Sequence, residues 1–222
     1  YDWQLIEDHP EKQFILIGAA PRKIVNSYTE LLDKAKLSIV ALEIEPVAIS
    51  RSLLAEENPN FRGQNTKNYG IIDIGAKRSN FTLYSRNAIL FSFSIPLSGG
   101  DITEKIAKSL NIEEAQAEKA KIICGLDENK AQGIIKNLLY EMIKNLVGKI
   151  KEAIIFYETH FPGRGPIDEF LICGGGANIK NIEKIISDYI SIKVSRGNVF
   201  INLDKDQEKI QQFFSETHAL EK

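Results

Sequence analysis

Apolar positions alternate between short runs and helical spacing along the first part of the chain. Residues 14–20 form a short apolar run closed by a proline, and over residues 24–35 the apolar positions recur at three- and four-residue steps, which is typical of an amphipathic helix. Residues 37–44 mix Ile, Val and Leu, and residues 47–54 follow a proline with helical composition. This part is therefore predicted to run strand, helix, strand, helix.

Three adjacent strands are predicted beyond a polar stretch. Residues 57–68 carry Pro, Gly, Asn and Gln and almost no apolar side chain, which predicts a linker. Runs of β-forming residues follow at 69–74, 81–85 and 88–95. Only residues 86–87 separate the last two runs, as in a tight hairpin.

Helices and one further strand are predicted over the rest of the chain. Asp101 is placed to cap the first helix, a second helix follows Asn111, and the longest covers residues 128–160, which contain no proline. Residues 170–173 predict a buried strand, and a glycine cluster precedes an amphipathic helix around residues 182–186. Strands interleaved with helices in this way indicate an α/β fold.

Composition and charge exclude several classes of protein. Hydrophobic residues make up 43% of the 222 positions, which is enough to form a buried core. The 28 basic and 30 acidic residues leave a net charge of −2, so no overall positive potential attracts nucleic acid or anionic lipid. The 2 cysteines, Cys124 and Cys173, lie too far apart for a metal knuckle or a disulfide framework. No apolar run approaches the roughly 20 residues of a membrane span. The chain starts at Tyr1 without an initiator methionine, so we expect a piece of a longer protein, with Tyr1 and Trp3 on a truncated strand edge.

The turn after the first of the three strands carries candidate chemistry. It runs Asp73-Ile74-Gly75-Ala76-Lys77-Arg78-Ser79-Asn80. Small residues let the main chain approach a phosphate, a hydroxyl can donate to it, and a carboxylate can hold a metal ion or its water. Taken alone, such an Asp-x-Gly turn is more often an ordinary hairpin.

A glycine-rich run and a charged helix pair are two further candidate features, and each is a weak signal when taken alone. The run Cys173-Gly174-Gly175-Gly176-Ala177-Asn178 lies between a strand and a helix, where glycines let a flat ring or a phosphate lie against the main chain. It lacks the P-loop lysine and the GxGxxG spacing, so a simple connector stays open. Glu118 and Lys121 share one helix face, which alone is typical of a solvated helix surface.

In this order the three motifs resemble the second large subdomain of the actin, Hsp70 and FtsA superfamily of ATPases, and in detail the type IV pilus assembly protein PilM family. Four more segments carry the resemblance: 20–25, 42–48, 95–103 and 197–200. It covers nearly the whole chain and implies the ribonuclease H-like, actin-like ATPase fold. It also implies a division of the chain. Residues 1–56 form the rest of the small inserted subdomain and a return into the first large subdomain, and residues 57–68 form a linker. Residues 69–203 form the second large subdomain, with a helical insertion at about 100–165, and residues 204–222 form a C-terminal tail.

The resemblance also implies a site for ATP with magnesium. Asp73 is expected near the magnesium ion and its water and is the candidate for a catalytic role. The other implied contacts are Gly75, Ala76 and Ser79 with phosphates, Glu118 and Lys121 with ribose or base, and Gly174, Gly175 and Gly176 with adenosine. Lys77 and Arg78 stand where the family usually has Asn and Thr, so we expect binding with weak or no hydrolysis. The family's first phosphate loop would lie before Tyr1.

The function implied by the resemblance is a cytoplasmic scaffold rather than a turnover enzyme. Such a protein binds ATP at the cytoplasmic face of the inner membrane and captures the N-terminal tail of the membrane protein PilN in a groove to which residues 1–56 contribute. Other pilus assembly proteins are implied partners, membrane association comes only through partners, self-association stays open, and nucleic acid is not expected. The alternatives are an FtsA-like division protein, whose basic membrane helix has no counterpart in 204–222, and a kinase or chaperone ATPase, for which no second acidic cluster is found in a glycine-rich turn.

Overall fold

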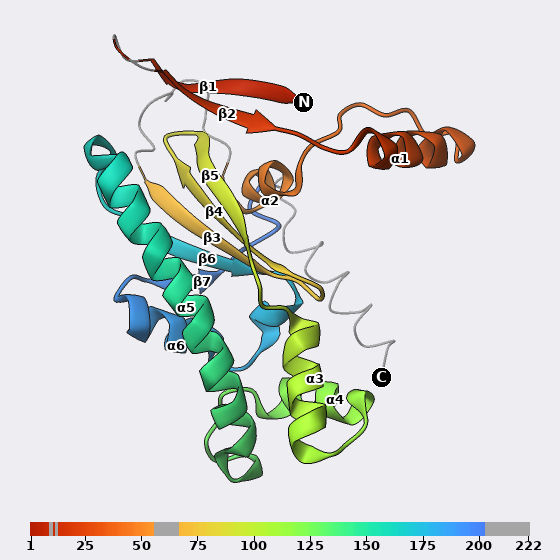
Figure 1. Cartoon of the computed structure of the whole chain (residues 1–222), viewed down its shortest axis with the longest axis vertical. Coiled ribbons are helices and arrows are strands. Elements are labelled where there is room, and N and C mark those ends of the chain that lie inside the picture. Colours follow the sequence, from red (N-terminus) through yellow and green to blue (C-terminus); the bar gives the residue numbers. More distant parts are fainter. Residues whose placement is uncertain (9–10, 12, 56–66, 203–222) are drawn as a thin grey trace.

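A mixed sheet forms the centre of the molecule (Figure 1). The computed structural model describes residues 1–8, 11, 13–55 and 67–202. Within them lies a 5-stranded sheet of order β5-β4-β3-β6-β7. Its strands are β3 (Asn68–Ile74), β4 (Ser79–Ser85), β5 (Ala88–Ile95), β6 (Glu169–Cys173) and β7 (Val194–Arg196). Neighbours among β3, β4 and β5 pair antiparallel, and β6 pairs parallel with both β3 and β7.

The predicted strands 69–74, 81–85, 88–95 and 170–173 are confirmed. The hairpin turn is confirmed as well, because Arg86 and Asn87 both have positive φ, at 49° and 64°, which matches the twist of the flanking strands. The predicted linker is outside the described residues over 57–66, and the predicted tail 204–222 is outside them entirely.

Four helices follow the hairpin in the described part of the chain. They are α3 (Gly99–Leu110), α4 (Glu114–Cys124), α5 (Ile134–His160) and α6 (Ile182–Ile190), with single turns of 3₁₀ helix at η2 (Ala131–Gly133), η3 (Pro162–Arg164) and η4 (Gly175–Asn178). The long helix was predicted to start at residue 128, which is wrong, because left-handed backbone at Gln132 and Gly133, with φ of 54° and 75°, delays its start to Ile134. None of the described helices combines the length and the apolarity that a bilayer crossing needs.

The cap of α3 also differs from the prediction. Ser98, not Asp101, is the capping residue, because its backbone is extended and its Oγ accepts a hydrogen bond from the amide of Asp101 at 3.0 Å. The hydroxyl of Ser98 in turn donates to the carboxylate of Asp101 at 2.6 Å. Asp101 therefore supports the cap from the first turn of the helix.

The two faces of the sheet are covered by different helices. Ile72, Phe81 and Phe170 belong to the main core, which α5 and α6 close along one face (Figure 1). On the other face Ile71 and Leu171 pack with Leu53 of α2 (Glu45–Leu53). Because strand side chains alternate between faces, Asp73 and Cys173 lie on the α2 side of the sheet.

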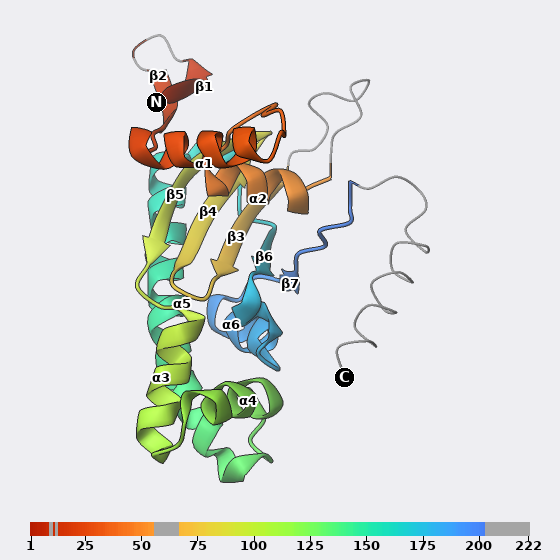
Figure 2. The ribbon, with the colours of Figure 1, turned by 90° about the vertical axis from the view of Figure 1, so that its right-hand side faces the viewer.

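The N-terminal strand pair packs on the edge of the main core through Ile6 and Phe14, whereas the helix that follows it stands apart (Figures 1 and 2). β1 (Asp2–Asp8) and β2 (Gln13–Gly18) form an antiparallel pair, in which Trp3 lies in β1 and Tyr1 directly precedes it. α1 (Arg22–Lys34) has no buried residue. The predicted strand over 37–44 is wrong, because this segment forms neither helix nor strand. No described strand pairs with it, and its side chains stay largely exposed.

Candidate functional site

The carboxyl ends of two parallel strands bring the predicted motifs together. Asp73 at the end of β3 lies opposite Cys173 at the end of β6, and the glycine run follows directly. Gly174 has φ of 77°, and a Cβ there would lie 2.4 Å from Oδ1 of Asp73 and 2.6 Å from the carbonyl oxygen of Ile74. Only glycine satisfies both the backbone angle and the close approach.

The rest of the glycine run is also fitted to the end of β3. A Cβ on Gly176 would lie 2.1 Å from Cγ2 of Ile74, whereas a Cβ on Gly175 would meet no atom within 4 Å. The loop is therefore packed against the strand at two glycines and faces open space at the glycine between them.

An open pocket of about 560 Å³ lies beside Asp73. Its lining combines two carboxylates, two cations and a small-residue turn: Glu45, Asp73, Gly75, Ala76, Lys77 and Arg78. Sequence reasoning missed Glu45, the first residue of α2. Its carboxylate accepts a hydrogen bond from Nδ2 of Asn80 at 3.0 Å and lies 3.6 Å from the guanidinium of Arg78. The Glu-Pro pair signals only a helix start, and nothing in the sequence connects Glu45 with the turn after β3.

The pocket shifts the protonation of its acidic groups. Burial raises the pKa of Asp73, and the nearby carboxylate of Glu45 raises it further, while the Cys173 thiol and Arg78 partly oppose the rise. Burial, followed by the charge of Asp73, raises the pKa of Cys173 to about 12. The thiol is therefore protonated at neutral pH and donates to Oδ1 of Asp73 over 3.8 Å.

Ser79 is placed differently from its predicted role. Its side chain is fully buried, and its hydroxyl donates to the carbonyl oxygen of Leu97 at 2.6 Å. The single hydroxyl hydrogen is thus used inside the protein. Lys77 and Arg78, rather than Ser79, line the pocket.

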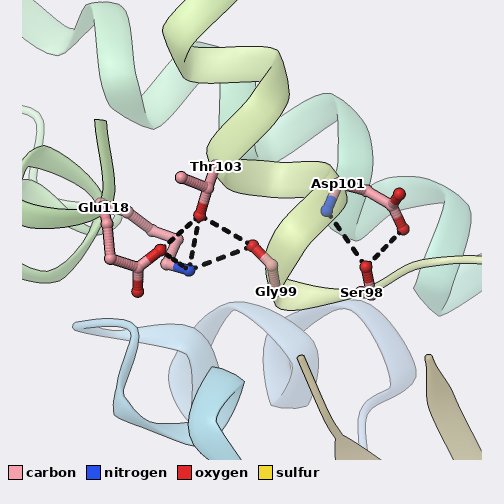
Figure 3. A network of polar contacts seen from close by, with 6 residues as sticks. Ser98, Gly99, Asp101, Thr103 and Glu118 are labelled. Atoms are coloured by element: carbon pink, nitrogen blue, oxygen red, sulfur yellow. Dashed lines mark hydrogen bonds and ion pairs between the residues drawn. The ribbon is translucent and has the colours of Figure 1, made fainter. Parts of the chain in front are cut away.

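Glu118 and Lys121 meet in a polar network at the start of α3 (Figure 3). Nζ of the buried Lys121 lies 2.7 Å from Glu118 Oε2, 2.9 Å from Thr103 Oγ1 and 3.1 Å from the carbonyl oxygen of Gly99. The single hydroxyl hydrogen of Thr103 is shared between the carbonyl oxygen of Gly99, at 2.9 Å, and the carboxylate of Glu118. Burial alone would raise the pKa of Glu118, but the hydrogen bonds from Lys121 and Thr103 outweigh it, and the net pKa is lowered.

Main-chain hydrogen bonds join this network to the turn at the pocket. The amide of Gly99 donates to the carbonyl oxygen of Gly75, and the amide of Gly100 donates to that of Ala76, both at 2.9 Å. The structure therefore links the predicted turn, the glycine run and the Glu118–Lys121 pair into one region around the end of β3. Sequence reasoning did not assign Thr103 or the contacts of Gly99 and Gly100.

Comparisons with known proteins agree on one superfamily. The sequence model of a family described as type IV pilus assembly protein PilM matches residues 2–219. The cell division protein FtsA of Staphylococcus epidermidis is 28% identical over 142 residues, covering 56% of this chain and 30% of that protein. FtsA of Buchnera aphidicola is 20% identical over 216 residues, covering 86% and 50%.

Solved structures show the same fold. A PilM–PilN type IV pilus biogenesis complex matches with a TM-score of 0.72 and 20% identity, covering 95% of this chain and 61% of that one. MreB5 of Spiroplasma citri bound to ADP matches with a TM-score of 0.63 and 19% identity, covering 90% and 68%. The fold is that of actin-like ATPases, as predicted. The chain spans between 30% and 50% of the length of these two FtsA relatives.

Proposed function

Because the chain belongs to the type IV pilus assembly protein PilM family, we propose that it is an actin-like, ATP-binding scaffold of the pilus assembly machinery. It acts on the cytoplasmic face of the inner membrane and captures the N-terminal tail of PilN. The proposal keeps the division into residues 1–56 and 69–203 with the linker and tail as predicted. The observation that carries the ATP-binding part is the pocket beside Asp73, next to the glycine run.

The residues of the site fit a nucleotide. Lys77 and Arg78 bring two cations to the pocket where polyphosphate would lie. Gly175 leaves open space above the main chain for a flat base. The carboxylate of Glu118, whose side chain is 46% exposed, is available to accept from ribose hydroxyls. Gly75 and Ala76 line the pocket with small residues, Gly174 and Gly176 let the glycine run pack on the end of β3, and Ser79 and Lys121 support the site from behind.

The same residues fit magnesium held mainly through water and phosphate. Among the described residues no group of three or more His, Cys, Asp or Glu is arranged to hold a metal ion. Mg²⁺ usually keeps several waters and takes one or two carboxylates together with substrate phosphates, and Asp73 and Glu45 supply two carboxylates on one pocket. When bound, ATP with Mg²⁺ supplies polyphosphate charge and an adenosine that favour one arrangement of the subdomains over another. The scaffold role requires this switch and needs little hydrolysis.

Calorimetric titration with ATP and Mg²⁺ tests the nucleotide part. It is carried out on the 222-residue chain and on the full-length protein, because the chain covers 61% of the PilM chain in the solved complex. We expect binding at least in the full-length protein, lost in Asp73→Ala and kept in Asp33→Ala, which alters an exposed carboxylate of α1. Absence of binding to both forms contradicts the nucleotide assignment and leaves a protein-binding module.

The N-terminal part offers a groove for the PilN tail. A cavity of about 540 Å³ is lined by β1, β2, α1, the segment before α2 and the first turn of α2, with Trp3, Leu16, Ile24, Tyr28, Leu42 and Val47 among its residues. Trp3 and Tyr28 are 62% and 58% exposed. Exposed aromatic and aliphatic side chains around one cavity favour capture of a peptide with apolar anchors.

The single tryptophan gives a direct test of this groove. A synthetic PilN tail from the same organism should shift the emission of Trp3 to shorter wavelength as the indole loses water. Tyr28→Asp should weaken peptide binding at least tenfold, because it places a charge in an apolar contact. Ile122→Asp on α4 is the matched control, since it alters a 54% exposed apolar side chain outside the groove. Equal affinity in all three proteins contradicts the assigned groove.

A further inference from the structure

One peptide group connects the polar network of α3 and α4 with the turn at the pocket. The carbonyl oxygen of Gly99 accepts from Lys121 and Thr103, and the amide of Gly100, at the other end of the same planar group, donates to Ala76. Hydrogen bonds in series polarise one another, and a cation at the carbonyl makes the amide a stronger donor. The charge of Lys121 therefore strengthens the bond that holds Ala76.

Lys121 has no hydrogen-bond donor left for a ligand. An ammonium group carries three donors, and the three partners of Nζ are Gly99, Thr103 and Glu118. The side chain is 8% exposed, against 46% for Glu118. Within the pair, only Glu118 presents its end to solvent.

The junction also depends on the absence of a side chain at residue 100. A Cβ on Gly100 would lie 2.9 Å from the carbonyl oxygen of Ala76, and one on Gly99 would lie 3.5 Å from that of Gly75 and 3.7 Å from Nζ of Lys121. The contact at Gly99 is an ordinary van der Waals distance, so it is Gly100 that allows the first turn of α3 to lie directly on the turn that lines the pocket.

We propose that Lys121 is a positioning residue that couples Glu118 to the 75–78 turn through the Gly99–Gly100 peptide group. A ligand that contacts both Glu118 and the turn therefore binds two elements whose relative position is already fixed. This inference rests on the proposed function only for the identity of the ligand, because the coupling itself is a property of the ligand-free chain.

The test compares Lys121→Met with Lys119→Met in two measurements. Methionine keeps the length of the buried stem, and Lys119 is an exposed lysine on the same helix, so both variants remove one charge. In the ligand-free chain we expect amide hydrogen exchange at Gly100 to become about tenfold faster in Lys121→Met and to change less than about twofold in Lys119→Met. The Kd for ATP in the full-length protein should rise by about tenfold in the first variant only.

A second variant guards against a simple loss of folding. Glu118→Gln keeps the shape of the network but weakens one of the three contacts that hold Nζ of Lys121 beside the Gly99 carbonyl. If positioning of Lys121 is what matters, exchange at Gly100 should rise in the same direction by about two- to threefold, with an unchanged far-ultraviolet circular dichroism spectrum. If Lys121→Met and Glu118→Gln leave exchange at Gly100 at the wild-type rate, the coupling is wrong.

The two measurements also separate this inference from the proposed function. A loss of ATP affinity without faster exchange at Gly100 means that Lys121 contacts the nucleotide directly, which overturns the positioning role. Faster exchange at Gly100 in a protein that binds no ATP supports the positioning role and contradicts the proposed function.

Discussion

Helices α1 and α3 have similarly clear amphipathic patterns, yet only one of them is covered. α3 buries Ile102 and Ile106 in the main core, next to α4 and α5, whereas α1 has no buried residue. Leu31 of α1 is 62% exposed, while Leu139 of α5 is fully buried. An apolar stripe specifies which face of a helix is to be covered, but it carries no information on what covers it.

The same contrast holds between the two parts of the chain. The sheet of residues 67–202 has α5 and α6 against one face and α2, from residues 45–53, against the other, so apolar side chains of its central strands are buried from both sides. In residues 1–44 the β1–β2 pair presents Trp3, Ile15 and Ile17 to solvent. Residues 67–202 contain most of the core, whereas residues 1–44 reach it through Ile6 and Phe14 and leave many apolar side chains exposed.

The largest expected effect tests this contrast directly. Leu139→Ala should lower the free energy of unfolding by about 2–5 kcal/mol, because it leaves a cavity in a close-packed core. Leu31→Ala should lower it by less than about 0.5 kcal/mol, since the side chain is already largely in water. Urea denaturation followed by circular dichroism measures both.

A large cost at Leu31 would break the comparison. A loss above about 1.5 kcal/mol would mean that α1 is covered in solution. Repeating the denaturation over a range of protein concentrations then tells whether a second copy provides the cover, because only an oligomer gives a concentration-dependent midpoint.

The strands of the five-stranded sheet were predictable from the sequence because local signals and tertiary packing agree there. The 81–85 and 88–95 runs are rich in β-forming residues and are separated by a two-residue turn that admits positive φ. The segment 37–44 has the same kind of composition, but it has no described neighbouring strand to satisfy its main chain. Composition alone therefore predicted a strand that tertiary pairing does not support.

The site was predictable as a set of motifs but not as a set of roles. Order along the chain pointed to Asp73, the glycine run and the Glu118–Lys121 pair. Burial then separates the pair, because Lys121 points inward and only Glu118 faces solvent. Glu45 reaches the pocket from a separate helix, and no spacing rule connects residues that only the fold brings together.

The second effect tests whether the tight packing of residues 67–202 extends to the loop at the candidate site. Gly174→Ala should lower the free energy of unfolding by about 1–3 kcal/mol, because alanine is strained at a φ of 77° and its Cβ would meet Asp73 and Ile74. Gly175→Ala is the matched control and should cost less than about 0.5 kcal/mol, since its Cβ meets nothing within 4 Å. Equal costs at the two positions would mean that the loop is not packed on β3 in solution.

The smallest effect has the opposite sign and separates function from stability. Because burial and Glu45 raise the pKa of Asp73 in the folded protein, the native state binds this proton more tightly than the unfolded chain does. The free energy of unfolding therefore falls as the pH rises from the ordinary aspartate pKa, roughly 3.9, through the raised folded value, and it stays lower at neutral pH.

Asp73→Asn removes that charge, so it should stabilise the chain at pH 7. The gain should be at most about 1 kcal/mol, because solvent screens a partly exposed group. It should vanish below about pH 3.5, where Asp73 is protonated in both states. Asp33→Asn on α1 should leave stability within about 0.5 kcal/mol at both pH values. Denaturation at pH 7 and pH 3 measures both variants. A loss of stability in Asp73→Asn at pH 7 would mean that Lys77 and Arg78 stabilise the carboxylate more than burial penalises it. A gain would mean that the chain keeps a charged Asp73 at a cost, as expected where a carboxylate is retained for binding rather than for folding.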